Sequence, residues 1–262
     1  MGHAMEVVSA FVTNPGATVS ATTIATGDSF SVRNFNPGAA AYLCDVWGQQ
    51  ATKGIIRIRS PRLHDNVQAI RLQNAAATPQ PLMADDLYVP LYAQDTLTVE
   101  QSGDAADTDC VSWLNYYTDL PGTNARLYTW EEIKPRIVQV MGTEVDITTG
   151  GTKGQYGGSV TINSTFDQFK ANTDYAILGY LTDTNVSTIG IKCADFGNLR
   201  LGGPGSTQRL ETRDWFIRND KSLPFPCIPV FNAANKGNCV VDVAANVTAT
   251  AIVTVIICAQ LS

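Results

Sequence analysis

Few residues of this chain have the types and spacing that catalysis needs. Only two histidines occur, His3 and His64, so a metal centre built from several imidazoles is excluded and a Ser-His-Asp triad would depend on His64. His64 and Asp65 fall in SPRLHDN, a predicted turn between strands, and no G-x-S-x-G motif accompanies them. We therefore predict that the protein is not an enzyme and uses no cofactor.

Three aspartates crowd into one predicted turn, GDAADTD: Asp104, Asp107 and Asp109. Carboxylate oxygens are the ligands that calcium prefers, which makes these residues weak metal candidates. The turn lacks the glycine-containing twelve-residue spacing of an EF-hand loop. A plain acidic hairpin is the alternative interpretation.

The densest basic patch lies in KGIIRIRSPR and consists of Lys53, Arg57, Arg59 and Arg62. Arg57 and Arg59 alternate with isoleucines, so a strand here would place both guanidinium groups on one face. One interpretation is a solvated outer face. The other is a salt-bridged contact between subunits, or contact with anionic lipid head groups.

Composition places the chain among globular proteins that do not bind nucleic acid directly. Its 262 residues are 44% hydrophobic, which is enough for a substantial core, and the formal charge is -6. The first basic residue is Arg33, so no basic arm precedes it. The first residues, MGHAMEVVSAFV, lack the charge of a secretory signal. Six cysteines without metal-binding spacing predict buried thiols in a protein made in a cytosol.

Short β-branched and aromatic runs, separated by turn clusters such as NPG and LPGTN, predict an all-β protein. Only one stretch is predicted as helix, residues 129–134, where Thr129 and Glu132 form a capping-box pattern and Pro135 limits the helix. The last run, AIVTVIIC, is apolar on both faces, which predicts a strand buried on both sides. Aspartate at Val255 or Ile257 should then abolish soluble expression.

The sequence predicts an internal repeat that relates the two halves of the chain, and the alternative is a coincidental match of alternating strand patterns. YVPLYAQDTLTVE (88–100) is echoed by CIPVFNAANKGNCVVDV (227–243), which pairs Pro90 with Pro229 and Glu100 with Asp242. IIRIRS is similarly echoed by TIGIKC. About eight strands in each half predict two tandem eight-stranded jelly-roll sandwiches, a double jelly roll. The predicted units are residues 1–120 and 136–262, with a linker of residues 121–135 that carries the short helix.

Two jelly rolls on one chain, with the paired phrases YVPLY/IPVFN, IIRIRS/TIGIKC and VSWLNYYTDL/AIVTVIICAQL, resemble the double jelly-roll major capsid proteins of tailless icosahedral viruses, the tectivirus and adenovirus lineage. The resemblance implies a coat protein that is synthesised in the host cytoplasm and located in the virion. It implies homotrimers that act as pseudo-hexagonal tiles of a capsid lattice, with minor capsid or penton proteins as partners and often an internal membrane beneath.

A glycan-binding β-sandwich, an adhesin or lectin-like protein, is the alternative function. It would use exposed tryptophans as stacking platforms, and the candidates are Trp47, Trp113, Trp130 and Trp215.

Overall fold

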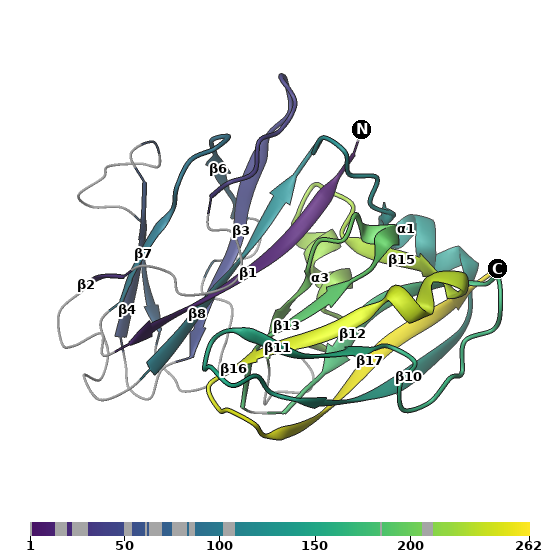
Figure 1. Ribbon diagram of the computed structural model, residues 1–262. Helices are drawn as coiled ribbons and strands as arrows, with labels where there is room; N and C mark the ends of the chain where they lie inside the picture. The colour runs from purple at the N-terminus through teal and green to yellow at the C-terminus, as the bar shows by residue number, and fades with distance from the viewer. Residues whose placement is uncertain are drawn as a thin grey trace.

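Figure 1 shows the computed structural model of the protein, which is built almost entirely of strands. The structure describes residues 2–13, 20–22, 31–49, 54–60, 62, 70–74, 83, 87–101, 108–183, 185–205 and 212–262. The strands in these ranges pair antiparallel and form four sheets. The all-β class predicted from the sequence is therefore confirmed.

The strands of residues 4–117, here called the first unit, form two four-stranded sheets. One has the order β1-β8-β3-β6 and consists of β1 (Ala4–Thr13), β8 (Thr108–Tyr117), β3 (Ala41–Gln49) and β6 (Val89–Leu91). The other has the order β2-β7-β4-β5 and consists of β2 (Ser20–Thr22), β7 (Thr98–Gln101), β4 (Gly54–Arg59) and β5 (Ile70–Asn74). Residues such as Val8, Trp113, Ile56 and Val99 pack between the two sheets as one core cluster.

The strands of residues 137–261, here called the second unit, repeat this arrangement. One sheet has the order β10-β17-β12-β15, from β10 (Ile137–Thr148), β17 (Ala251–Leu261), β12 (Asp174–Leu181) and β15 (Ile228–Asn232), and β9 (Leu127–Tyr128) extends its edge. The other has the order β11-β16-β13-β14, from β11 (Tyr156–Thr161), β16 (Val240–Ala245), β13 (Val186–Lys192) and β14 (Leu201–Pro204). Numbered within each unit, the strand orders are 1-8-3-6 and 2-7-4-5 in both.

A β-bulge occurs at the same place in both units. Cys44 is skipped in the β3–β8 register, and Leu178 is skipped in the β12–β17 register. Pro90 lies opposite the residue two before Cys44, and Val230 lies opposite the residue two before Leu178. The equivalent of Pro90 is therefore Val230, and the predicted match of Pro90 with Pro229 is wrong by one residue.

The predicted match of Glu100 with Asp242 agrees with the strand register. Arg57 of β4 lies opposite Glu100, and Gly190 of β13 lies opposite Asp242. The IIRIRS and TIGIKC segments, aligned at their first Ile-x-Ile, place Arg57 and Gly190 at the same position. Two separate sequence matches therefore give one consistent pairing.

The predicted helix is present, and a second helix was missed. Helix α1 (Trp130–Ile133) begins at the capping box of Thr129 and Glu132, and the 3₁₀ turn η1 (Lys134–Arg136) follows. Helix α3 (Trp215–Ser222) has no side-chain hydrogen bond at its N-cap. It is stabilised by tertiary contacts, since the indole N–H of Trp215 donates to the Gly202 carbonyl at 2.8 Å and Phe216 is buried. Two further 3₁₀ turns are η2 (Ala194–Phe196) and η3 (Ala233–Asn238).

The run AIVTVIIC of the C-terminal strand is buried on one face only, so the prediction that both of its faces are buried is wrong. Ile252 and Ile256 of β17 are buried, whereas Val253 is 56% exposed and Val255 and Ile257 are half-buried. β17 lies between β10 and β12, and its outward side chains are exposed or half-buried along residues 251–257, whereas Ala259 and Leu261 are buried. Aspartate at Val255 therefore places a charge on a partly solvated face, and the predicted loss of soluble expression no longer follows.

The four sheets lie one behind another along the molecule. In Figure 1 the β2-β7-β4-β5 sheet lies at the left end, the β1-β8-β3-β6 sheet and then the strands β11, β13 and β16 follow, and β10 and β17 lie at the far right. The largest core cluster crosses the boundary between the units, because it contains Met5 and Trp47 of the first unit together with Ile189 and Trp215 of the second. The two units are therefore joined through a shared apolar core.

Candidate functional site

The basic patch on β4 is organised around one buried carboxylate. Ile56 and Ile58 point into the core, and Arg57 and Arg59 lie on the opposite face, as the alternation predicts. Both arginines bind Glu100 of β7, whose side chain is 2% exposed, and the Arg59 guanidinium lies 2.9 Å from Oε1. Two guanidinium groups on one carboxylate satisfy its oxygens and leave a net positive charge on this face.

The structure says less about Arg62 and Lys53, the other two residues of the predicted patch. Arg62 is exposed, and Lys53 lies outside the described residues. The ion pairs of Arg57 and Arg59 are made within the chain. Contact of this patch with another subunit, or with lipid head groups, stays a prediction. Sequence reasoning used Glu100 only as a repeat anchor and missed that it binds these arginines.

The second unit has a buried acid at the equivalent position. Asp242 of β16 is buried, and Nε of Arg200 lies 3.2 Å from its Oδ2. Burial raises the pKa of Asp242, and the charge of Arg200 opposes that shift. The Arg200 guanidinium also lies 4.1 Å from the centre of the Tyr156 ring. The opposite residue, Gly190, leaves room for this cluster, because a Cβ there would approach Asp242 Oδ1 to 2.7 Å.

The two units meet through a buried chain of hydrogen bonds. The indole N–H of Trp47 on β3 donates to Oγ1 of Thr188 on β13 at 2.9 Å, and that hydroxyl donates to Oγ of Ser112 at 2.6 Å. Ser112 donates to Ser9 at 3.0 Å, and Ser9 donates to the Gly154 carbonyl at 3.1 Å. Because each link is buried, the chain holds the outer face of the β1-β8-β3-β6 sheet against the outer face of the β11-β16-β13-β14 sheet.

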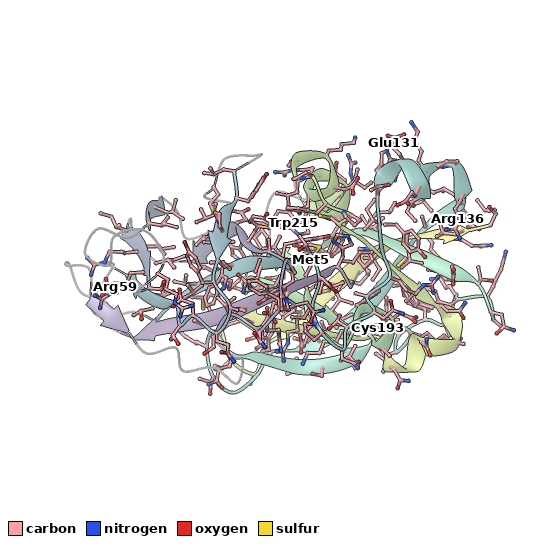
Figure 2. The ribbon with its side chains drawn as sticks, turned by 90° about the horizontal axis from the view of Figure 1, so that it is seen from above. Met5, Arg59, Glu131, Arg136, Cys193 and Trp215 are labelled. Carbon is pink, nitrogen blue, oxygen red and sulfur yellow. The ribbon has the colours of Figure 1, made fainter. Side chains whose placement is uncertain are left out.

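Aromatic and apolar contacts surround this hydrogen-bonded chain. Figure 2 shows Met5 and Trp215 near the middle of the molecule and Arg59 at one end. Trp215 meets Trp47 edge-on with ring centres 6.2 Å apart, and Tyr116 stacks on Phe225 at 4.5 Å. These contacts bury large side chains from both units and fix their relative orientation.

The burial of the tryptophans bears on the glycan-binding alternative. Trp47, Trp113 and Trp215 are at most 2% exposed. Their predicted role as exposed stacking platforms is therefore wrong. Trp130, on α1, is half-buried.

The predicted calcium ligands lie mostly outside the described residues. Asp104 and Asp107 are not described, and of Asp109 only the backbone is described, in β8 opposite Val12. Among the residues that the structure does describe, no group of three or more His, Cys, Asp or Glu could hold a metal ion. A calcium site at this turn stays an untested prediction.

The two histidines and the six cysteines offer no exposed reactive centre in the described chain. His64 and Asp65 lie outside the described residues, and Nδ1 of His3 lies 2.9 Å from the Tyr116 hydroxyl. Burial lowers the pKa of His3. All six cysteines are buried thiols outside any disulfide, as predicted.

One face of the second unit is both apolar and open. Val140 and Val253 are 54% and 56% exposed and lie on the outward side of β10 and β17, and Val138, at the bulge of β10, is 62% exposed. A hollow of about 340 Å³ lies at Val253 and is lined by Leu181, Thr182, Asp183, Ala251, Val253 and Val255. Exposed valines on the outward side of a sheet are typical of a surface that contacts another molecule. Within the described residues, no helix has the length and apolar character needed to cross a bilayer.

Comparison with known proteins does not identify a family for this chain. No protein-family model and no curated protein matches the chain. Among solved structures, the chain is similar to the PBSX exported protein XepA, with 7% identity, 98% of this chain and 86% of that chain covered, and a TM-score of 0.26. It is also similar to the major capsid protein P2 from bacteriophage PM2, with 5% identity, 99% and 98% coverage and a TM-score of 0.25. The structure of Sulfolobus Turreted Icosahedral Virus matches with 8% identity, 100% and 91% coverage and a TM-score of 0.22. TM-scores this low decide neither the fold family nor the function.

Proposed function

We propose that the chain is a structural coat protein built as a double jelly roll, with jelly rolls at residues 1–120 and 136–262 and a linker at residues 121–135. The observation that carries the proposal is the repeated strand order 1-8-3-6 and 2-7-4-5 in the two units. In this order successive strands alternate between the facing sheets, apart from the fourth and fifth, as in a jelly roll folded from two Greek keys.

The join between the units supports a structural role. A tile in a closed shell must hold a fixed shape, because every copy presents the same contacts to its neighbours. Here the units share an apolar core and the buried hydrogen bonds from Trp47 to Gly154. A flexible linker would allow the units to rotate, whereas this interface favours one rigid block.

The assembled form is proposed to be a homotrimer that tiles a capsid lattice in the virion. Three chains supply six similar units, which suits hexagonal packing. Minor capsid or penton proteins would close the lattice, and an internal membrane is a further proposed partner, with Lys53, Arg57, Arg59 and Arg62 as candidate contacts. The charge of -6 does not favour direct contact with nucleic acid.

Light scattering of the purified protein over a concentration series tests the proposal. We expect a stable trimer of about 84 kDa, three times the 28.1 kDa of one chain, with interfaces above the roughly 1,200–2,000 Å² of a standard complex. Electron microscopy of concentrated samples should show hexagonal tiles. A strict monomer at every concentration would count against the coat-protein function.

A further inference from the structure

Within the described residues, the chain joins one pair of sheet faces internally, and the equivalent pair carries exposed side chains such as Ile55 and Val253. The outer face of β1-β8-β3 contacts the outer face of β11-β16-β13-β14, as the bond between Ser112 and Thr188 shows. The two sheets at the ends of the molecule repeat the strand orders of these joined sheets. The open valine face is the outward side of β10-β17-β12, and the open arginine face is the outward side of β4.

Residues of the open valine face have buried equivalents in the first unit. We align the two units at their bulges: Leu114 lies opposite the residue after Cys44, and Ile257 lies opposite the residue after Leu178, so Ile257 corresponds to Leu114. Counting along the paired strands from this point matches Val255 with Ser112 and Val140 with Met5. Leu114, Ser112 and Met5 are 0% exposed because the second unit covers them. Val140, by contrast, is 54% exposed.

Residues of the open arginine face have equivalents in the second unit, and these equivalents lie on the face that covers the first unit. The register that matches Arg57 with Gly190 also matches Ile55 with Thr188. Thr188 is 0% exposed at the contact between the units, whereas Ile55 is 40% exposed. Each of the two faces that meet inside the chain therefore has an equivalent face in the other unit that carries exposed residues.

The two open faces differ in polarity from the two faces that meet inside the chain. Inside the chain, Thr188 meets Ser112 and Trp47 through hydrogen bonds at 2.6 Å and 2.9 Å. The equivalents of these three residues are Ile55, Val255 and Leu181, and all three are apolar. The three residues at the centre of the polar contact therefore correspond to apolar residues on the open faces, whereas Ser9, the next link of the hydrogen-bonded chain, corresponds to the charged Glu144.

The rims of the open faces carry opposite charge. Glu144 and Asp146 lie opposite Val255 and Val253 on the open valine face. Arg59 and Arg62 lie at or beside the open arginine face. Apposed acidic and basic rims favour association of these two faces and disfavour contact of either face with itself.

We propose that the open valine face binds the open arginine face of a second copy of this chain, in the same orientation in which the two units meet within one chain. The contact is heterologous, so each chain uses one face for each neighbour, and the assembly closes as a ring or continues as a filament. This inference deepens the proposed coat-protein function and rests on it, since three chains joined in this way form the trimer.

Single substitutions at the two faces test the contact. Val253→Asp adds a charge at a position already 56% exposed in the single chain, so folding should be retained. Ile55→Asp does the same on the other face. Each variant should lower the light-scattering mass from about 84 kDa towards the 28.1 kDa of one chain, at a concentration where the unaltered protein is a trimer. Phe166→Asp is the control, because Phe166 is 53% exposed outside both faces and should leave the trimer intact.

Cysteine cross-linking tests the pairing itself. Hydroxyl oxygens at the equivalent internal positions, Ser112 and Thr188, are 2.6 Å apart, which brings their Cβ atoms close to disulfide range. The double variant Ile55→Cys, Val255→Cys should therefore give covalent dimers and trimers under mild oxidation. Neither single variant should cross-link, since the native cysteines are buried.

The outcomes separate this inference from the function on which it rests. A trimer that survives Val253→Asp and Ile55→Asp, or a dimer formed by the single Val255→Cys variant, overturns the proposed contact while assembly itself stands. A monomer without any substitution overturns both. A covalent ladder that continues past the trimer supports the contact and overturns the closed ring.

Discussion

Replacing Thr188 with valine should weaken the join between the two units. Thr188 is 0% exposed, accepts a hydrogen bond from Trp47 and donates one to Ser112. Valine has nearly the same shape but removes both bonds and leaves the indole N–H of Trp47 without this acceptor. Each lost bond costs about 0.5–1.5 kcal/mol, and a buried donor left unsatisfied costs about 1–3 kcal/mol. We therefore expect a loss of about 2–4 kcal/mol in the free energy of unfolding.

Urea denaturation, followed by tryptophan fluorescence, measures this loss. Trp47 and Trp215 lie where the units meet, so their emission should change when the units separate. The midpoint should fall while the m-value stays constant, since the surface exposed on unfolding is unchanged. Protein concentration must be the same for every variant, because self-association adds to the apparent stability.

Thr254→Val is the matched control. Thr254 is also 0% exposed, but its hydroxyl has no hydrogen-bond partner in the described structure. The same chemical change there should cost nothing or stabilise the protein slightly, because a buried hydroxyl that lacks a partner is removed. Equal effects of the two substitutions would refute the assignment of the hydrogen-bonded chain as the element that joins the units.

Two further predictions concern the second unit. Gly190→Ala should destabilise the protein by about 1–3 kcal/mol in urea denaturation, because the added Cβ would lie 2.7 Å from Asp242 Oδ1 and overpack the cluster. Gly237→Ala is the control, because nothing lies within 4 Å of the Cβ added there. Equal losses of stability in the two variants would contradict the steric explanation. The hydrogen bond from Arg126 lowers the pKa of Asp174, so the stabilisation by this carboxylate is complete above the unfolded pKa of about 3.9 and is lost as the pH falls through the lower folded value. The stability difference between the unaltered protein and Asp174→Asn should therefore shrink below about pH 4, and a difference that is constant from pH 7 to pH 2 would contradict this coupling.

Much of the fold was predictable from the sequence. The alternation around Arg57 and Ile58, the capping box at Thr129 and the match of Glu100 with Asp242 all agree with the structure. Each depends on local periodicity, or on backbone bonding between neighbouring strands. Helix α3 was not predictable in this way, because it lacks an N-cap hydrogen bond and depends on the burial of Trp215.

The candidate site was predictable only in part. Arg57 and Arg59 were identified as a charged pair, but their partner Glu100 is 43 residues from Arg57 in the sequence and is brought opposite it by the pairing of β4 with β7. The tryptophans show the same limit. Their residue type favours both a core and a binding surface, and only the packing of one unit on the other decides between the two.

The sequence by itself determined the all-β class, the alternation of side chains along strands such as β4 and the match of Glu100 with Asp242. Those features depend on side-chain alternation and on turn residues, which are properties of short segments. The tertiary structure alone decided which outward faces are covered. Met5 and Val140 hold the same place in their units and are both apolar, yet Met5 is 0% exposed and Val140 is 54% exposed. The difference arises because burial depends on which surface lies opposite, and the second unit lies opposite Met5, whereas the face that carries Val140 is open in the single chain.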